Sequence, residues 1–405
     1  MAKTLLQINS VVNSGSTGRI AEEIGQVAAA AGWRSVIAFG RNARPSSSKL
    51  IRIGNARDVF LHGVRSRIFD DHGFGSRHAT EKFLREIEQL APDVVHLHNL
   101  HGYYLNIEVL FRWLAKSGVS VVWTLHDCWA FTGHCAHFSA AGCEKWKNGC
   151  FSCPQKRGYP SSFAFDRSRE NWERKRELFS YVENLTLVPV SDWLAGLVRE
   201  SFLGGKKIRR IYNGTDTETF SPKTNAADVR KKYGLGNRFV ALGCATSWNE
   251  RKGLRHYIDL AKRVGNDVAI LMVGVPEKLK ARLPANIVAI SRTENIDELA
   301  ELYSVADVVL NLSYEETFGL TTVEGFSCGT PGIVFNATAS PELITPETGF
   351  VVEQGDVDGV LAAIAKIRAC GKVAYSAACR SRALERFRKE ERWAEYLEAY
   401  AGAGK

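Results

Sequence analysis

Short apolar runs alternate with segments whose apolar residues recur at helical spacing through most of the chain. The first half contains the runs TLLQIN, RSVIAF, DVVHLH, VSVVWTLH and LTLVPV, and the second half contains FVALGCA, VAILMVG, IVAIS, ADVVLNL and PGIVF. Nearly continuous apolar strands of this kind are buried on both faces, as in parallel sheets covered by helices. The pattern therefore predicts an α/β protein with a doubly wound parallel sheet in each half.

The length of 405 residues exceeds what one ordinary core holds, so we expect two domains. The polar segment 211–222, which contains an Asn-Gly turn, is the predicted linker. We expect domains at 1–220, with a cysteine-rich loop at 128–153, and at 221–384. Residues 385–405 carry apolar positions at helical intervals with no strand after them, which predicts a terminal helix docked on one domain.

Composition narrows the class of protein only partly. A hydrophobic content of 45% with 24% charged residues is typical of a soluble globular protein. The 53 Lys and Arg against 44 Asp and Glu give a net charge of +9, which favours nucleic acid, acidic headgroups or phosphorylated small molecules as partners. The N-terminal segment is interpreted as a first strand and turn instead of a signal peptide, and no apolar stretch predicts a membrane span, so we expect a cytoplasmic protein.

The stretch SYEETFGLTTVEGFSCGTPGI, residues 313–333, follows a predicted strand and begins a glycine-led helix. The amides of Phe318, Gly319 and Leu320 are then donors at a helix N-terminus, which is a phosphate site. Glu316 and Glu324 lie on either side of those amides. Hydroxyls flank the diphosphate of a sugar nucleotide on both sides, and each carboxylate can accept two hydroxyl hydrogen bonds. The alternative is a pair of solvated helix acids.

These residues resemble a known family. Glu316 and Glu324 match the E-x7-E signature of family 4 retaining glycosyltransferases, and a glycine turn near residue 15, TLHD at 124–127, NGTD at 213–216 and RKG at 251–253 follow in the family's order. The segment HLHNLHGYYLN and the cysteine-rich region resemble the bacterial branch that builds capsular and colanic-acid-type polysaccharides.

The resemblance implies a GT-B fold, in which two Rossmann-like domains face each other across a cleft and the C-terminal helix crosses back to the N-terminal domain. It also implies a hexosyltransferase that moves a sugar, with retention, from a nucleoside-diphosphate sugar to a hydroxyl of a glycan or lipid-linked acceptor. No catalytic metal is expected. Glu316 would be catalytic and contact the donor hexose, and Glu324 would contact the ribose. A GT-B-shaped sugar-nucleotide epimerase is the alternative; a basic zinc-containing nucleic-acid-binding protein is a further one, although no nucleic-acid partner is expected.

Lys252 is the predicted catalytic cation on the donor side. It follows a strand at a turn into a helix, where its charge would offset that of a leaving diphosphate. Family members usually carry an arginine five residues before this lysine, and here that position is Ser247. Arg251 is the expected second donor-binding cation; the alternative is a surface pair beside Glu250.

Three loops of the N-terminal domain supply the remaining candidates. Gly15 and Gly18 follow the first strand and are expected to approach the donor phosphate, although a plain tight turn is the alternative. The spacing does not match the dinucleotide pattern G-x-G-x-x-G. His126 ends a buried strand and is predicted to be catalytic, touching the sugar or steadying the transition state. Asp127 is predicted to orient the imidazole or to bind the acceptor.

The segment HLHNLHGYYLN, residues 96–106, follows another strand of the same domain. We expect His98 and Asn99 to lie on the acceptor side, and we expect His96 and His98 to point to opposite faces.

Cys135, Cys143, Cys150 and Cys153 lie close together in the sequence, the last two as C-x2-C. Four thiolates from one loop could hold a structural zinc ion, with His134 and His137 as substitute ligands; free or disulfide-linked cysteines are equally open.

Two basic segments, 156–179 and 204–210, suggest peripheral contact with anionic lipid at the inner face of the plasma membrane, near a membrane-borne acceptor. Solvated helix faces explain the same charges.

Overall fold

The computed structural model describes residues 2–402, and the chain divides into two compact units. Unit 1 contains the residues up to Tyr212 together with those from Arg392 onward, and unit 2 runs from Asn213 to Glu391. The sequence placed the first boundary between residues 220 and 221, whereas the units change between Tyr212 and Asn213. In the part of the chain that is described, no helix combines the length and the hydropathy needed to cross a membrane.

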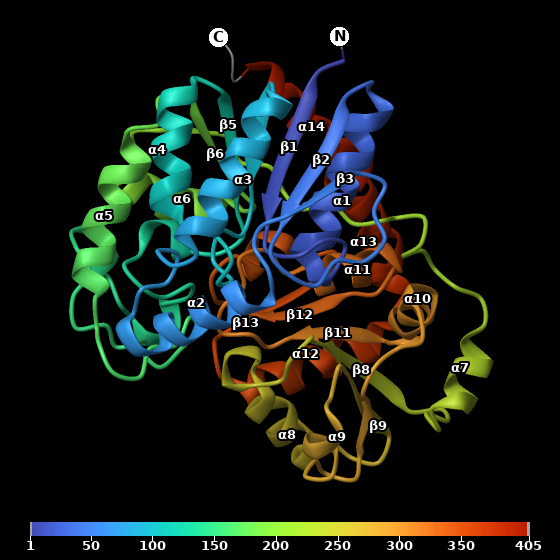
Figure 1. The fold of residues 1–405 in the computed structure, drawn as a ribbon. Coiled ribbons are helices and arrows are strands. Elements are labelled where there is room, and N and C mark those ends of the chain that lie inside the picture. Colours follow the sequence, from blue (N-terminus) through green and yellow to red (C-terminus); the bar gives the residue numbers. More distant parts are fainter. Residues whose placement is uncertain (1, 403–405) are drawn as a thin grey trace. The chain divides into compact units, whose positions relative to one another are not determined.

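Unit 1 is built on a parallel sheet with the strand order β3-β2-β1-β4-β5-β6-β7 (Figure 1). Its strands are β1 (Thr4–Asn9), β2 (Arg34–Phe39), β3 (Lys49–Arg52), β4 (Val94–Leu97), β5 (Ser120–Leu125), β6 (Leu185–Pro189) and β7 (Lys207–Ile208). Leu6 of the central β1 pairs with Val36 on one side and with Val95 on the other. The strands β1, β4 and β6 are buried at every position, as predicted for apolar runs covered on both faces.

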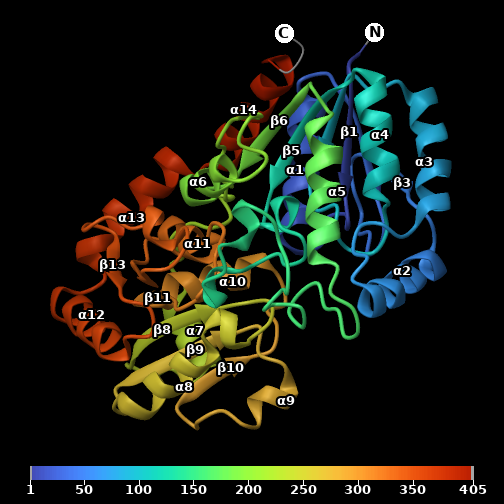
Figure 2. The ribbon, with the colours of Figure 1, turned by 90° about the vertical axis from the view of Figure 1, so that its left-hand side faces the viewer.

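Helices cover both faces of the unit 1 sheet (Figure 2). They are α1 (Gly15–Ala30), α2 (Ala56–Phe69), α3 (Arg77–Leu90), α4 (Ile107–Ser117), α5 (Ser168–Ser180), α6 (Asp192–Glu200) and α14 (Lys389–Gly402), with short 3-10 turns at Trp129–Phe131, Ser139–Ala141 and Lys145–Lys147. The side chain of Asn106 accepts a hydrogen bond from the amide of Val109 at 3.0 Å and so begins α4.

The C-terminal helix α14 belongs to the core of unit 1. Trp393, Tyr396 and Tyr400 are buried against Leu5 of β1 and residues of α1, in one hydrophobic cluster. The hydroxyl of Tyr400 lies 2.7 Å from Nδ1 of His96. This packing holds α14 against β1.

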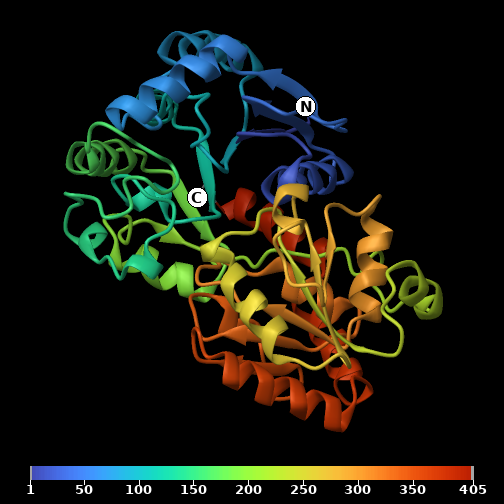
Figure 3. The same cartoon turned by 90° about the horizontal axis from the view of Figure 1, so that it is seen from below.

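Unit 2 also contains a parallel sheet, and its strand order is β10-β9-β8-β11-β12-β13. In Figure 3 most of this unit is coloured from yellow to red. The strands are β8 (Phe239–Cys244), β9 (Val268–Val273), β10 (Ile287–Ile290), β11 (Val308–Asn311), β12 (Gly332–Phe335) and β13 (Gly349–Val352). The helices are α7 (Ala226–Lys232), α8 (Leu254–Arg263), α9 (Glu277–Lys280), α10 (Ile296–Val305), α11 (Leu320–Ser327), α12 (Val357–Cys370) and α13 (Val373–Arg386), with 3-10 turns η4 (Glu250–Lys252) and η5 (Ser340–Leu343).

Two hydrophobic clusters lie on opposite faces of the unit 2 sheet. One includes Leu260 of α8 and Val360 of α12, and the other includes Val229 of α7 and Leu302 of α10. The α/β class with two parallel sheets is therefore confirmed.

Candidate active site

In each unit the strand order reverses between two neighbouring strands. The reversal falls between β1 and β4 in unit 1, and between β8 and β11 in unit 2. Open parallel sheets bind ligands outside the carboxyl ends of the strands at such switch points. The loops after β1, β4 and β5 carry the candidates of unit 1, and the loops after β8 and β11 carry those of unit 2.

Lys252 and Glu316, predicted separately from two loops of unit 2, form an ion pair. Lys252 ends η4, which begins where the side chain of Asn249 accepts the Lys252 amide at 3.1 Å. Gly253 follows with φ of +72°, and a Cβ there would lie 2.0 Å from the carbonyl oxygen of Leu312. The loop after β8 can press against the end of β11 only because residue 253 is glycine.

The charge of Glu316 depends on its cationic neighbours. Burial raises the pKa of this carboxyl, but the charge and hydrogen bond of Lys252, with a contribution from Arg251, outweigh burial and lower the pKa below its usual value. Arg251 also donates to the carbonyl oxygen of Glu315 at 3.2 Å. Arg251 was expected to replace the arginine that family members usually carry. Its guanidinium therefore lies beside the loop that contains Glu316.

The start of α11 follows Glu316 directly. Gly319 has φ of +102° and precedes the first helical residue, Leu320, which is half-buried. The ring of Phe318 is buried and packs edge-on against Phe387 with 5.7 Å between ring centroids. The side chain of Phe318 is thus a packing residue, and only its amide is a candidate donor.

Two residues that the sequence did not indicate fix the positions of Glu324 and Glu316, one through the carboxylate and the other through the backbone. The hydroxyl of Tyr303 on α10 donates to Oε2 of Glu324 at 2.8 Å. The amide of Glu316 donates to the hydroxyl of Thr338 at 2.8 Å, and the carbonyl of Glu316 accepts from the amide of Ala339 at 3.2 Å. Both holding residues are distant in sequence, so no local pattern reveals them.

His126 and His98 lie together at the switch point of unit 1. Nε2 of His126 is 3.2 Å from Nδ1 of His98, whose Nε2 is 3.0 Å from the side-chain oxygen of Gln7 on β1. Burial lowers the pKa of His126 to about 4, although the adjacent Asp127 raises it in part. Burial also lowers the pKa of His98 well below its ordinary value. Both imidazoles are therefore neutral near pH 7.

Asp127 was predicted to orient the imidazole of His126 or to bind the acceptor. In the structure it contacts His101. Its Oδ2 lies 2.7 Å from Nε2 of His101, and Nδ1 of His101 lies 3.0 Å from the hydroxyl of Tyr159. Burial raises the pKa of Asp127, but His101 outweighs burial and the pKa lies well below its usual range. His101 lies in the segment 96–106, from which only His98 and Asn99 were predicted to belong to the site.

The glycine turn and Asn99 occupy the neighbouring loops. Gly15 is exposed at the first position of α1 with φ of +63°, while Gly18 is buried and its carbonyl accepts from the amide of Asn13 at 3.1 Å. The carbonyl of Asn99 accepts from the hydroxyl of Tyr104 at 2.9 Å. Among the described residues, no hydrogen bond joins either glycine to the histidine pair.

The expectation that His96 and His98 point to opposite faces is wrong. Their ring centroids are 4.0 Å apart. Residues two apart in an extended strand lie on the same face, so the two rings lie side by side, tilted by 36°. His96 contacts Thr124 and Tyr400, which makes it a packing residue beneath the candidate site.

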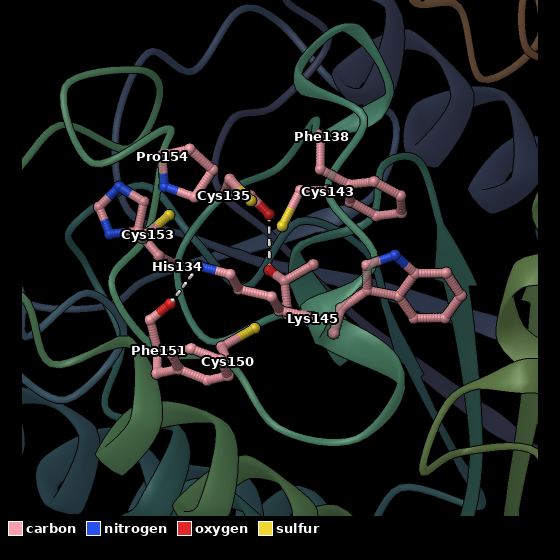
Figure 4. Close-up of a pocket in the computed structure, with 11 residues that line it drawn as sticks. His134, Cys135, Phe138, Cys143, Lys145, Cys150, Phe151, Cys153 and Pro154 are labelled. Atoms are coloured by element: carbon pink, nitrogen blue, oxygen red, sulfur yellow. Dashed lines mark hydrogen bonds between the residues drawn. The ribbon is translucent and has the colours of Figure 1, made fainter.

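The four clustered cysteines line one small pocket of unit 1 (Figure 4). Cys135 and Cys153 are joined by a hydrogen bond between their thiols, and the sulfur of Cys150 accepts from the amide of Gly133 at 3.2 Å. None of the nine cysteines, all of which lie in the described part of the chain, forms a disulfide. Among the residues described, no three or more His, Cys, Asp or Glu side chains are grouped so that they could hold a metal ion, so the structure gives the zinc hypothesis no support. His134 instead pairs with Asp70.

The chain matches two family models. A family model described as Glycosyltransferase Family 4 matches residues 17–219, and one described as Glycosyl transferases group 1 matches residues 237–369. The first match contains the unit 1 candidates from Gly18 to Asp127, and the second contains all those of unit 2.

The chain is also similar in sequence to two characterised or named proteins. A colanic acid biosynthesis glycosyl transferase of Escherichia coli K12, WcaC, is 27% identical over 372 residues, which are 87% of this chain and 88% of that protein. A GDP-mannose-dependent phosphatidylinositol dimannoside mannosyltransferase of Mycobacterium tuberculosis is 31% identical over 163 residues, 38% of this chain and 42% of that protein.

Among solved structures, sucrose-phosphate synthase of Thermosynechococcus elongatus superposes with a TM-score of 0.71 at 18% identity, covering 99% of this chain and 98% of the other. The HepE protein of Anabaena in complex with UDP-glucose gives 0.67 at 15% identity, covering 98% and 99%. At these identities the likeness concerns the fold alone, and it agrees with the expected GT-B class.

Proposed function

Because this chain belongs to glycosyltransferase family 4, we propose that it moves a hexose, with retention of configuration, from a nucleoside-diphosphate sugar to a hydroxyl of a glycan or lipid-linked acceptor. Members of this family are glycosyltransferases, so this chain is one as well. Similarity to WcaC over 87% of the chain supports a role in surface polysaccharide synthesis. The UDP-glucose complex of HepE, a protein of the same fold, supports a nucleotide-sugar donor.

The observation that carries the proposal is the Lys252–Glu316 pair at the switch point of unit 2, directly before α11. Charge grows on the leaving diphosphate in the transition state, and a cation beside it lowers the barrier. Lys252, assisted by Arg251 and the first amides of α11, supplies that charge. Glu316 then accepts hydrogen bonds from the hexose hydroxyls, and Glu324 accepts those of the ribose.

Retention can be reached by two routes, and the environment of Glu316 favours one of them. A carboxylate that is paired with a lysine is a poor nucleophile, because attack on the sugar would need its free lone pairs. We therefore favour substitution on a single face through an oxocarbenium-like state, in which the departing phosphate takes the proton of the acceptor hydroxyl. Double displacement through a protein carboxylate is the competing mechanism.

The unit 1 residues would serve the sugar and the acceptor. A neutral His126 can exchange hydrogen bonds with a sugar hydroxyl but carries no positive charge. Asp127, fixed by His101, remains ionised and can accept a hydrogen bond from an acceptor hydroxyl. Gly15, at the exposed start of α1, leaves room for a phosphate or an acceptor group near the backbone.

The test begins with a panel of UDP-, GDP- and ADP-sugars, scored first by thermal shift and then by release of nucleotide. With the active donor, NMR of the product anomer reports the stereochemistry, and we expect the donor's configuration to be kept. Inversion would overturn the retaining mechanism. Conversion of the donor without an acceptor would identify an epimerase. Stabilisation by none of the sugar nucleotides would overturn the donor class.

A further inference from the structure

Arg41 is a cation without a partner at the ligand-binding edge of unit 1. It follows the carboxyl end of β2, and open parallel sheets bind ligands at this edge. The residue is half-buried, and its Nε is buried without a hydrogen-bond partner. No acidic side chain of residues 2–402 forms an ion pair with it. Removing an unpaired charge from water costs free energy, so this guanidinium is suited to an anion from outside the chain.

The surroundings of Arg41 fix its backbone and leave one side of its guanidinium uncovered. The amide of Arg41 donates to the carbonyl of Ser10, directly after β1, at 3.1 Å. A Cβ added to Gly102 would lie 3.7 Å from Nη2 of Arg41. Gly102 has a φ of +127°, which residues with a side chain rarely adopt. Position 102 therefore places bare backbone, and no side chain, beside the guanidinium.

Tyr103 adds a second unpaired polar group from the same loop. Only 8% of the residue is exposed, and its hydroxyl has no hydrogen-bond partner among the described residues. Its φ of +67° is rare for a bulky side chain, and strained positions of this kind cluster at ligand sites. The fold thus holds Tyr103 in a strained conformation while its hydroxyl stays available to a ligand.

Arg67 of α2 supplies a second cation above Tyr103. Its guanidinium carbon lies 5.2 Å from the centroid of the Tyr103 ring. Nη1 donates to the carbonyl of Gly63 at 3.1 Å, and in the described part of the chain Arg67 has no acidic partner either. Burial raises the pKa of Tyr103, and the charges of Arg67 and Arg41 both oppose this rise. The two guanidinium groups therefore act on one hydroxyl, and we call Arg41, Arg67 and Tyr103 the arginine–tyrosine cluster.

Tyr159 connects this cluster with Asp127. Burial, together with Tyr103 and Asp127, raises the pKa of Tyr159, and the same two arginines oppose the rise. The hydroxyl of Tyr159 lies 3.0 Å from Nδ1 of His101, and Nε2 of His101 lies 2.7 Å from Oδ2 of Asp127. The hydroxyl of Tyr159 is thus already engaged, so Tyr159 is not counted in the cluster. The cluster and Asp127 are neighbours on the acceptor side of unit 1.

The chemistry of the cluster selects a phosphate group. Its donors come from three separate segments, which are the loop after β2, helix α2 and the loop after β4. A terminal phosphate offers three acceptor oxygens and a charge of about −1.5 to −2, which matches two guanidinium groups and a hydroxyl. A carboxylate offers two oxygens and a single charge. A neutral sugar offers no charge to either arginine.

We propose that the arginine–tyrosine cluster binds a phosphate group of the acceptor while Asp127 receives the acceptor hydroxyl. The phosphate belongs either to a free sugar phosphate or to the lipid phosphate of a linked saccharide, and both present the same anion. The assignment to the acceptor rests on the proposed function, whereas binding of phosphate at the cluster does not. The donor diphosphate remains assigned to Lys252 and Arg251 of unit 2.

Isothermal titration calorimetry of the full chain with glucose 1-phosphate tests the subsite. We expect glucose 1-phosphate to bind, and we expect glucose to bind at least tenfold more weakly. Arg41→Gln should weaken binding of the phosphate at least tenfold, because charge-assisted hydrogen bonds are lost, and Tyr103→Phe about threefold. Arg34→Gln is the matched control. It removes the same charge from the exposed amino end of β2 and should bind as the parent does.

Glucose 1-phosphate also resembles part of a sugar nucleotide, so the titration is repeated with Lys252→Met. This variant lacks the donor-side cation and should keep its affinity for the probe. Loss of binding in Lys252→Met, with Arg41→Gln unchanged, would assign the phosphate to unit 2 and overturn the proposal. Absence of binding by the parent would overturn it as well. Equal losses in Arg41→Gln and Arg34→Gln would do the same, because the effect would then be one of net charge.

Protection from chemical modification tests the same site in the unaltered chain, where no variant has to fold. Phenylglyoxal reacts with guanidinium groups, and mass spectrometry reports each arginine separately. A saturating concentration of glucose 1-phosphate should slow the modification of Arg41 at least threefold and leave that of Arg34 unchanged. Modification of Arg41 at an unchanged rate would contradict the assignment.

Two further probes identify the source and the class of the anion. Tighter binding of geranyl diphosphate than of glucose 1-phosphate would indicate a lipid-linked acceptor, and the reverse would indicate a free sugar phosphate; both outcomes support the subsite. Glucuronate that binds as tightly as glucose 1-phosphate would overturn the choice of phosphate.

The donor assay separates this proposal from the proposed function. The thermal shift with the active sugar nucleotide should be the same in Arg41→Gln and in the parent, because Arg41 is not assigned to the donor. Failure of the phosphate titration alone would therefore remove the subsite and leave the transferase, whereas failure of every sugar nucleotide would remove the donor class and leave the phosphate subsite.

Discussion

Replacing Glu316 by Gln removes the carboxylate of the Lys252 pair while keeping its shape. Both side chains are mostly buried, with 19% of Lys252 and 14% of Glu316 exposed. Exposed ion pairs contribute up to about 1 kcal/mol, and breaking a fully buried one costs about 3–5 kcal/mol. We therefore expect Glu316→Gln or Lys252→Met alone to lower the free energy of unfolding by about 2 kcal/mol. The double variant should lose less than the sum, because it leaves no unpaired charge.

Catalysis should respond differently from stability. Removal of a single group that stabilises transition-state charge costs about 2.7–4 kcal/mol, which is at least 100-fold in kcat. A domain of ordinary stability stays folded after losing about 2 kcal/mol, so unfolding cannot account for a loss of that size. We expect each single variant to fall at least 100-fold, and we expect the double variant to stay inactive although its stability partly recovers.

Urea unfolding and initial-rate kinetics with the active donor measure the two quantities on the same samples. Glu298→Gln is the matched control, because Glu298 is also buried and paired with a lysine, Lys232, away from the site. It should lose stability and keep its activity. The reasoning is refuted if the double variant regains activity in step with its stability, because the pair would then be structural only.

Four further outcomes follow from the structure. Burial, aided by the charge of Arg65, lowers the pKa of His62 to about 3, so protons favour the unfolded state below pH 6.5; His62 should account for about 2 kcal/mol of the stability lost from pH 7 to 5, and in urea unfolding His62→Gln should lose that much less than the parent. Gly253→Ala should lower the free energy of unfolding by more than about 2 kcal/mol, since its Cβ would overlap a carbonyl oxygen. Lys175→Met leaves two carbonyls, those of Trp129 and Thr132, without their buried donor and should cost about 2–4 kcal/mol by the same measurement, with faster hydrogen exchange in the surrounding loop. EDTA should leave transfer rates unchanged in the nucleotide-release assay, since the diphosphate charge is assigned to protein groups.

The strands and the donor loops were predictable because both depend on local pattern. All ten predicted strands are present, whereas three short ones, β3, β7 and β13, were not predicted. The meeting of Lys252 and Glu316 could be anticipated because each follows a strand, and the ends of parallel strands converge at a switch point.

The contacts that fix the site could not be predicted in the same way. Tyr303 reaches Glu324 from another helix, and His101, not His126, holds Asp127. The change of unit between Tyr212 and Asn213 falls inside the predicted linker 211–222, but eight residues before the boundary placed after residue 220. The amide of Thr215 donates to the carbonyl of Phe387 at 2.7 Å, and this long-range pairing draws the predicted linker into unit 2. Such pairs carry no periodicity, so they become visible only when the fold is known.

In α2 the local pattern indicates a helix, but it does not indicate which side of that helix is buried. The spacing of Phe60, Leu61 and Ile68 indicates a helix with one apolar side, and the usual inference buries that side. Here the small and polar residues His62, Gly63 and Ser66 occupy the buried side, and His62 contacts the hydroxyl of Ser76. An apolar stripe left in water lowers solubility and adds nothing to folding. Departures of this kind from local rules are expected at functional positions, so the outward stripe is itself a reason to look for a partner of low polarity.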